Sequence, residues 1–448
     1  MRWLKLPDFI SIPLISDRNT TTFREKECGL FDDLWNMERY NYNVPSRSFC
    51  SNYCPSLPFH DNSNPQWFDC KRETMPEIEF VMGNGQHCYV VTSNGRNDVK
   101  NQICIQNVAR YLNSSKSNDT KLVYLTHGYA DHPWIHGNES WMQVTKDILL
   151  KRYGSSTIVV GVVNWEHGAR GTFSRALGSK RDIYDLIYGL GLKSLPLVLC
   201  CAPGSLYRTA ASSTWAIGNI LAYLDNEITN KVLPKRINKF CIGHSLGGQL
   251  CGFFGKMVKI LDPKFPVTKI IGLDPAGPIF EDKDKSGPQD PDLRLNKGDA
   301  TNVEIFHTSR PLGFMDPAGD VDFYINGGNI QPECNPDTIK KHTQLECSHM
   351  FAIKLFNLLT KNELSCSANW KCKITVGSSL HDIKMENVTK LEHAGCSLQP
   401  EVTLGSLDQT NGYHEGVYWV EADEDSKTCK TLEETLKNSR KNILELLT

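Results

Sequence analysis

Ser245, near the middle of the chain, has the surroundings of a catalytic nucleophile. It lies in the stretch FCIGHSLGGQL, residues 240–250, between Gly243 and Gly247. The apolar run before it and the small residues after it predict a strand, a sharp turn and a helix, the setting that lifts a serine hydroxyl clear of the backbone. Because the pattern G-x-S-x-G also occurs in ordinary glycine-rich turns, the interpretation depends on an acid, a base and oxyanion donors elsewhere in the chain.

A serine hydroxyl reacts near neutral pH only when a base takes its proton and a carboxylate orients that base. Where the serine lies on a strand-to-helix turn, the acid and then the histidine follow it along the chain. Asp274 ends the next predicted strand, and Pro275 makes the following turn rigid. Six histidines lie further on, at His307, His342, His349, His381, His393 and His414. His307 lies within a predicted strand, where a histidine can belong to the core, and His349 lies in ECSHMFAIKLF, just before an apolar helix. Position alone does not separate the two histidines, and we favour His349 as the base.

Two backbone N–H groups are predicted to stabilise the negative charge that develops on the substrate oxygen. The first belongs to Leu246, directly after the nucleophile. The second comes from the segment LTHGYADH, which follows a predicted strand and has the form of a loop that supplies such a donor, here from Tyr129.

The elements that must hold these groups alternate between strands and helices from residue 76 onward. This alternation predicts an α/β fold in which a mostly parallel sheet carries helices on both faces. The carboxyl ends of such strands meet at one edge of the sheet, where ligands bind. The apolar runs predict strands at 122–126, 157–163, 239–242, 269–273 and 303–307, and helices at 140–153, 214–224 and 246–261.

The chain is predicted to have three parts. Residues 1–75 are rich in Asn, Pro, Ser and Cys and predict an irregular extension stapled by disulfides. Residues 76–430 form the predicted catalytic domain, and residues 431–448 form a tail. The segment 166–206 interrupts the domain on the side of the predicted site with the apolar run IYDLIYGLGLKSLPLVLCCAP. It is either a helical hairpin packed on the surface or an apolar rim that docks on a lipid surface.

Cysteine usage predicts a secreted protein. The 16 cysteines lie mainly in the first and last parts of the chain, as in a disulfide framework, and no pair recurs at zinc spacing. The opening segment MRWLKLPDFISIPLISD is broken by prolines and contains no clear signal segment. With 49 basic and 51 acidic residues and no basic stripe, nucleic acid is not an expected partner. Sequons for N-glycosylation agree with export and lie at Asn19, Asn113, Asn118, Asn138 and Asn387.

A series of short segments resembles the pancreatic lipase family, in the family's order. The resemblance covers roughly residues 75–425 and implies an α/β-hydrolase fold. It implies Ser245, Asp274 and His349 as the catalytic triad. It also implies the backbone N–H groups of Tyr129 and Leu246 as the oxyanion hole. The segments are THGY (126–129), VVNW (162–165), GHSLGG (243–248), GLDPAGP (272–278), VEIFHT (303–308), GDVDFYINGG (319–328) and CSHM (347–350).

The resemblance also implies a lid, the loop between two cysteines before the catalytic histidine. Here the cysteines are Cys334 and Cys347, and the loop NPDTIKKHTQLE between them holds 12 residues. If that disulfide forms, closing the loop contributes about 3 kcal/mol in the chain-entropy model. The lid is too short and too polar to bury a broad mouth, and the loop from His307 to Asp322 also looks short. Both features resemble the phospholipase A1 branch of the family.

The family's calcium loop is only partly kept in PDLRLNKGDA. The carbonyl of Arg294 and the carboxylate of Asp299 match, but Asn296 replaces one acidic ligand and Pro291 stands at another. A calcium site at Arg294, Asn296 and Asp299 is therefore one hypothesis and a plain turn is the other, and no cofactor is required. Only the tail 431–448 follows the predicted catalytic domain, so we expect no C-terminal β-sandwich and no colipase.

The sequence therefore predicts a secreted serine hydrolase that cleaves acyl esters of glycerolipids at a micelle or membrane surface through an acyl-enzyme. The short lid favours phospholipase A1 activity over triacylglycerol lipase activity. A non-catalytic lipid-binding or yolk-type protein on the same fold is a further alternative, but such proteins typically lose triad residues. A peptidase is disfavoured by the lipase-like segments outside the triad. The sequence makes no prediction of oligomeric state.

Overall fold

The structure is a computed structural model of the chain. The predicted extension before Met75, most of the insertion 166–206 and the tail 431–448 lie outside the residues that it describes, so their predicted roles stay predictions. The described residues are 75–94, 98–114, 119–129, 131, 140–154, 157–170, 206–232, 235–278, 280–281, 291–310, 312–314, 316–334, 341–361, 367–372, 396–408, 415–423 and 428–430.

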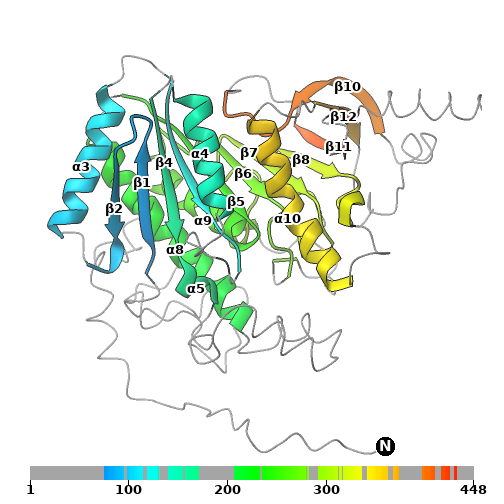
Figure 1. Ribbon diagram of the computed structural model, residues 1–448, viewed down its shortest axis with the longest axis horizontal. Coiled ribbons are helices and arrows are strands. Elements are labelled where there is room, and N and C mark those ends of the chain that lie inside the picture. Colours follow the sequence, from blue (N-terminus) through cyan, green and yellow to red (C-terminus); the bar gives the residue numbers. More distant parts are fainter. Residues whose placement is uncertain are drawn as a thin grey trace, which may run out of the picture.

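One twelve-stranded sheet forms the centre of the described structure (Figure 1). Its order is β10-β9-β11-β8-β7-β6-β5-β3-β4-β1-β2, and β12 pairs with β11. All pairs from β4 through β11 are parallel, whereas β1, β2, β9, β10 and β12 pair antiparallel. The strands are β1 (Glu77–Met82), β2 (His87–Val91), β3 (Thr120–Thr126), β4 (Thr157–Asn164), β5 (Asn238–His244), β6 (Lys269–Leu273), β7 (Asn302–His307), β8 (Val321–Ile325), β9 (Ser367–Cys372), β10 (Cys396–Thr403), β11 (Gly416–Asp423) and β12 (Thr428–Lys430).

Helices cover both faces of this sheet, as predicted. The helices α3, α5, α8 and α9 pack into one apolar cluster, and α4 and α10 pack into a second cluster on the opposite face. Figure 1 shows α4 and α10 in front of the central strands. The described helices are α3 (Val99–Ser114), α4 (Trp141–Tyr153), α5 (Glu166–Arg170), α8 (Leu206–Asn230), α9 (Leu246–Leu261) and α10 (Lys341–Thr360).

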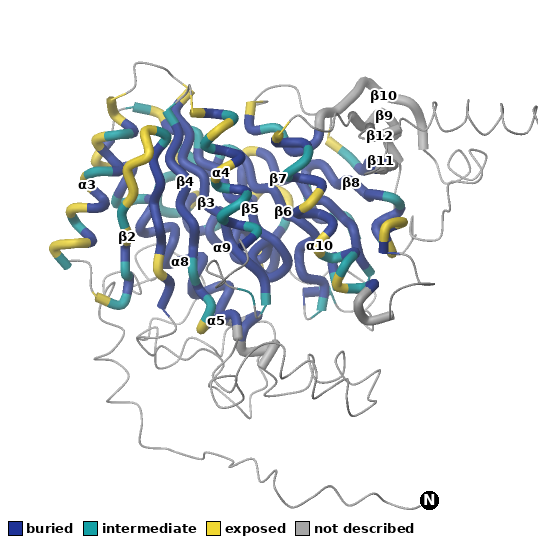
Figure 2. The backbone as a smooth tube through the Cα atoms, in the orientation of Figure 1, coloured by how far each residue is buried: buried dark blue, intermediate teal, exposed yellow. Residues whose placement is uncertain are grey.

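Strand β3 shows why the sheet needs two helical layers. Every residue of TKLVYLT is buried. Successive side chains of a strand point to opposite faces, so Leu122 and Tyr124 enter the first cluster while Val123 and Leu125 enter the second. A continuous apolar run of this kind is stable only where both faces are covered. Figure 2 shows the result, with the central strands buried and the exposed residues gathered on outer helices such as α3.

Three disulfides join described residues. Cys88–Cys104 links β2 to α3, and Cys334–Cys347 is the predicted lid bridge. The third, Cys241–Cys251, links β5 to α9. The distribution of cysteines predicted a framework in the outer parts of the chain, and this bridge in the middle was not predicted. None of the described helices is long and apolar enough to cross a membrane.

Candidate active site

The carboxyl ends of β3, β5, β6 and β7 bring the predicted site residues to one edge of the sheet. These four strands are parallel neighbours. Gly128 follows β3, Ser245 follows β5, Asp274 follows β6 and Thr308 follows β7. A backbone hydrogen bond joins the ends of β5 and β6, in which the N–H of Ser245 donates to the carbonyl oxygen of Leu273 at 3.1 Å. The structure therefore assembles at one place groups that are far apart in the sequence.

Ser245 occupies a strained turn between β5 and α9. Its φ of 56° and ψ of −124° lie where non-glycine residues are rare. A Cβ on Gly243 would lie 2.2 Å from Gly247 O, and a Cβ on Gly247 would lie 2.3 Å from Thr126 O. Both positions therefore require glycine, which explains the G-x-S-x-G spacing. Strain held at one serine by such close packing is typical of a functional site.

Asp274 is a fully buried carboxylate at the end of β6. Like Ser245, it has a positive φ, of 46°. Its Oδ1 accepts hydrogen bonds from the backbone N–H groups of Thr308 (2.7 Å) and Ser309 (3.1 Å). Its Oδ2 accepts from the Ser309 hydroxyl. These donors fix the direction in which the carboxylate points.

His349 is the histidine that meets this carboxylate. Its Nδ1 donates to Asp274 Oδ2 at 2.6 Å, and its side chain is 12% exposed. None of the described residues forms a hydrogen bond with Nε2. The ring lies against that of His244, the residue before Ser245, with ring centroids 4.4 Å apart. No hydrogen bond joins the described side chains of Ser245 and His349, a contact that in free enzymes often tightens only when substrate binds.

The prediction that His349 precedes the apolar helix is wrong, because α10 begins at Lys341 and includes it. The second half of the predicted lid loop, residues 341–346, is thus the start of this helix. The buried residues Phe351, Ala352, Leu355, Phe356 and Leu359 recur at helical spacing. Their packing holds His349 on a rigid element beside the strand ends.

His307, the other candidate base, is a core histidine. Its Nε2 lies 2.8 Å from Asp322 Oδ1, and its Nδ1 donates to Phe314 O at 3.0 Å. Burial by itself lowers the pKa of His307, but the hydrogen bond and charge of Asp322 outweigh it, so the pKa is raised. The ring stacks on Tyr324 with centroids 4.2 Å apart. Both nitrogens are occupied, so His307 has none left to take a proton from a nucleophile.

His244 differs from both of these histidines. Burial, and then the neighbouring His349, lower the pKa of His244 to about 3. The ring is therefore neutral at ordinary pH, and its Nε2–H donates to His349 O at 3.1 Å. This hydrogen bond connects the nucleophile strand to the helix that carries the predicted base.

The loop that follows β3 lies directly against the nucleophile. A Cβ on Gly128 would lie 2.7 Å from Ser245 Cβ and 3.2 Å from its Oγ. Trp165 anchors this loop, because its indole N–H donates to His127 O at 3.0 Å and its ring stacks on that of His127. Tyr129, the predicted oxyanion donor, is the next residue along the loop. The role of its N–H stays a prediction.

Leu246, the other predicted oxyanion donor, is the first residue of α9. The first N–H groups of a helix have no partner within the helix and carry its positive dipole end. A backbone N–H at this position is suited to a developing negative charge, but its role also stays a prediction.

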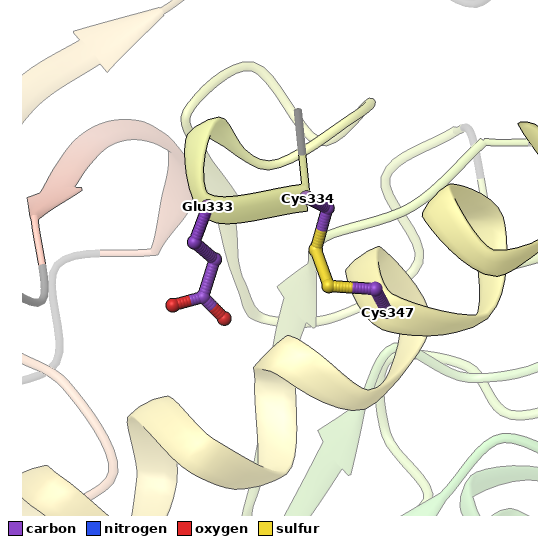
Figure 3. Close-up of side chains that lie close together, drawn as sticks. All are labelled: Glu333, Cys334 and Cys347. Atoms are coloured by element: carbon purple, nitrogen blue, oxygen red, sulfur yellow. A yellow bond between two sulfur atoms is a disulfide. The ribbon is translucent and has the colours of Figure 1, made fainter. Parts of the chain in front are cut away.

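The lid cysteines form the disulfide that the resemblance implied (Figure 3). Glu333 lies beside them, close enough for the three residues to resemble a metal-binding group. Both sulfurs are bonded to each other, however, and Glu333 pairs with Lys354 at 2.9 Å. This cluster is therefore a structural bridge. Residues 335–340 of the lid lie outside the described residues.

The calcium hypothesis concerned Arg294, Asn296 and Asp299. In the structure the ammonium of Lys256, on α9, bonds to the Arg294 carbonyl and to both carboxylate oxygens of Asp299. Burial raises the pKa of Asp299 to about 6, and the charge of Lys256 opposes that rise. The Asn296 side chain instead donates to Lys297 O at 3.1 Å. The residues present do not fit a calcium ion, because a lysine holds the oxygens that would bind it.

Comparison with known proteins agrees with this geometry. The profile of the Lipase family matches residues 201–375. A phospholipase A1 of Vespa velutina is 31% identical over 253 residues, which cover 56% of this chain and 69% of that protein. A phospholipase A1 of Vespa crabro is 41% identical over 158 residues, covering 35% of this chain and 48% of the relative. The probable phospholipase A1 magnifin of Vespa magnifica is 39% identical over 253 residues, or 56% and 62% of the two chains. The matches thus span about half to two thirds of these relatives.

Proposed function

Because this chain belongs to the pancreatic lipase family of ester hydrolases, we propose that it is a phospholipase A1-type enzyme that removes one acyl chain from glycerophospholipids. The observation that carries the proposal is the strained serine at the end of β5 beside a histidine that is hydrogen-bonded to a buried carboxylate. Strain at Ser245 has no structural purpose in an ordinary turn. A lipid-binding protein without catalysis would need neither this strain nor the ordered carboxylate.

The proposed reaction proceeds through an acyl-enzyme. Nε2 of His349 takes the proton of the Ser245 hydroxyl while Oγ attacks the acyl carbonyl carbon. The N–H groups of Tyr129 and Leu246 stabilise the oxyanion that forms. His349 then gives its proton to the departing glycerol oxygen, and the ester bond breaks.

Deacylation repeats these steps with water as the nucleophile. His349 takes a proton from the water, whose oxygen attacks the acyl carbon, and returns the proton to Ser245 as the fatty acid leaves. Asp274 stays ionised throughout and stabilises the imidazolium. Its bonds from Thr308, Ser309 and His349 suit that role, because they hold the carboxylate in one orientation against the imidazole.

The short lid supports a phospholipid as substrate. Cys334 and Cys347 allow only 12 residues between them, and the last six already belong to α10. So short a lid leaves the mouth of the site open to a polar head group. The wasp relatives, which are named as phospholipases A1, support the same substrate class. Triacylglycerol hydrolysis is expected to be weaker.

We also propose an extracellular location and a lipid surface as the partner, without colipase. Disulfides persist in oxidising compartments and are rare in the cytosol. Three of them join described residues here, two in the central domain and one at the lid. The bridge between Cys241 and Cys251 directly adjoins the nucleophile turn, which ties the proposed activity to an oxidising environment.

The test offers phosphatidylcholine and triolein side by side as mixed micelles and measures the released fatty acid and lysolipid. We expect release of the sn-1 acyl chain of phosphatidylcholine and slower release from triolein, with both lost in Ser245→Ala. Hydrolysis of triolein alone would make the protein a triacylglycerol lipase. Binding of lipid with no hydrolysis, and no covalent labelling of Ser245 by a fluorophosphonate, would support the non-catalytic alternative.

A further inference from the structure

The loop that follows η7 (Pro291–Leu293) surrounds a positively charged side chain, the ammonium of Lys256. Lys256 extends from α9 into this loop, and its side chain is only 11% exposed. The side chain of Asp299, which it meets, is 6% exposed. An ammonium and a carboxylate that have lost so much contact with water must satisfy each other or be satisfied by other protein groups.

All three hydrogens of the Lys256 ammonium have an oxygen acceptor. Nζ lies 2.8 Å from Arg294 O and 2.5 and 2.6 Å from Asp299 Oδ1 and Oδ2. A lysine ammonium has three donors and no acceptor. The backbone N–H of Asn296 donates to Asp299 Oδ2 at 2.8 Å, which adds a further bond to the carboxylate. The site is therefore complete without an ion.

A calcium ion fits this site poorly. Calcium takes six to eight oxygen ligands. Of the candidate ligands, the Arg294 carbonyl and the Asp299 carboxylate already bind Nζ, and the Asn296 amide donates elsewhere. An ion at their centre would have to displace a positive charge that is covalently part of the chain.

The loop held by Lys256 packs against the helix that begins at the nucleophile. A Cβ on Gly255 would lie 2.2 Å from Asp299 O, and a Cβ on Gly252 would lie 2.7 Å from Leu295 Cα. Gln249 accepts from Leu295 N at 2.8 Å and donates to Ala276 O at 2.8 Å. Helix α9 is thus bound on one side to the loop and on the other to the turn after Asp274.

We propose that Lys256 is a built-in substitute for a bound calcium ion, which keeps this loop and helix α9 in place without any metal. The protein then needs no calcium to fold or to act, and chelators leave it unchanged. This inference concerns the loop and does not depend on which ester the site cleaves.

The first test uses the unmodified protein. Its thermal unfolding midpoint is measured in EDTA and in millimolar calcium, and calcium binding is measured by calorimetric titration. We expect the same midpoint in both solutions and no binding heat from this site. A midpoint that falls in EDTA and recovers with calcium, or calcium binding that Asp299→Asn abolishes, would overturn the proposal. Neither readout requires catalysis, so an inactive protein would still give a result.

The second test compares three variants on the same helix. Lys256→Met keeps the length of the side chain but removes the charge, Lys256→Arg keeps the charge, and Lys259→Met removes an exposed charge one turn further on. We expect a midpoint several degrees lower for Lys256→Met, with recovery of most of that loss in Lys256→Arg and no loss in Lys259→Met. Equal midpoints for Lys256→Met and Lys259→Met would contradict the proposal. If Lys256→Met does not fold, the chelation experiment still decides.

Discussion

Two histidine–aspartate pairs lie near the same edge of the sheet, and only one of them is arranged for catalysis. In the first pair His349 Nδ1 lies 2.6 Å from Asp274, and in the second His307 Nε2 lies 2.8 Å from Asp322. The two distances are nearly equal. The distance between imidazole and carboxylate therefore does not distinguish a catalytic pair from a structural one.

The two pairs differ at the ring nitrogen that does not contact the carboxylate. Nδ1 of His307 donates to Phe314 O, and the ring is fully buried against Tyr324. His349 has no hydrogen-bond partner for Nε2 among the described residues, and its side chain is 12% exposed. A histidine can act as a base only if one nitrogen is held by the acid while the other is available to the nucleophile.

The two carboxylates should respond differently to the same change. Asp274→Asn removes the charge that stabilises the imidazolium, and it should lower kcat by about 10⁴-fold with little loss of folding. Asp322→Asn instead removes the partner of a buried histidine. It should lower the free energy of unfolding by about 3 kcal/mol and change kcat less than tenfold. Steady-state kinetics and denaturant unfolding of both variants check this. A large loss of kcat in Asp322→Asn at unchanged stability would contradict the comparison.

Two glycines, Gly313 beside Asp274 and Gly319 beside Asp322, allow a second comparison of the two pairs. A Cβ on Gly313 would lie 2.3 Å from Asp274 Oδ1, whereas a Cβ on Gly319, whose N–H donates to Asp322, would meet the carbonyl oxygens of Val303 and Val321. Gly313→Ala should displace the catalytic carboxylate and lower kcat by about 100-fold, the effect of roughly 1 Å of misplacement. Gly319→Ala should lower the unfolding midpoint without comparable loss of kcat. Equal kinetic losses in both variants would remove the distinction.

Ser309 should make a smaller contribution. Its hydroxyl donates to Asp274 Oδ2, but two backbone donors hold Oδ1 without it. Loss of one hydrogen bond of about 1 to 1.5 kcal/mol predicts a fall in kcat of about tenfold for Ser309→Ala. Tyr324→Leu, which removes the ring that stacks on His307, is the control and should affect only stability. An unchanged kcat in Ser309→Ala would show that the hydroxyl does not position Asp274.

The buried pair of His307 and Asp322 should also affect how the free energy of unfolding depends on pH. The pKa of His307 is raised in the folded state, so the folded protein binds this proton more tightly than the unfolded chain does. Its contribution is complete below the unfolded pKa of about 6.5 and is lost as pH rises through the folded pKa. The difference in unfolding free energy between the wild type and His307→Gln should therefore shrink as pH increases. Denaturant unfolding at several pH values measures it, and a difference that grows with pH would contradict this assignment.

The contribution of His244 to the free energy of unfolding should depend on pH in the opposite direction. Its folded pKa of about 3 lies below the unfolded value, so only the unfolded chain takes up this proton as pH falls from about 6.5 to about 3. His244 therefore lowers stability over that interval. The variant His244→Gln should lose less stability than the wild type between these pH values.

The strand ends and the nucleophile turn could be predicted from the sequence because local patterns determine them. The apolar run before Gly243 and the glycine after Ser245 require a strand and a tight turn, and the next strand places Asp274 beside them. Ser245 and Asp274 each lie within a few residues of the apolar run that predicts the strand before them. The same is true of the alternation that predicts helices on both faces.

Position along the chain did not separate the two histidines, and only the resemblance to the family pointed to His349, because the physical distinction depends on contacts between distant segments. His307 is excluded by Phe314 and by Asp322, which reach it only after the chain has folded. Lys256 illustrates the same limit. Nothing in the sequence of α9 indicates that this lysine meets Asp299, 43 residues further along the chain. The helix start at Lys341 was missed because the polar residues of the lid conceal it.

The assignment of His349 as the catalytic base can be tested by the rate at which a fluorophosphonate labels Ser245 in two matched variants, His349→Gln and His307→Gln. Both replace an imidazole by a neutral amide, and circular dichroism confirms that each variant is folded before labelling. We expect His349→Gln to reduce the labelling rate by several orders of magnitude, as loss of a triad base does. We expect folded His307→Gln to be labelled at nearly the wild-type rate. Fast labelling of His349→Gln, or equal loss in both variants, would contradict the assignment of His349 as the base.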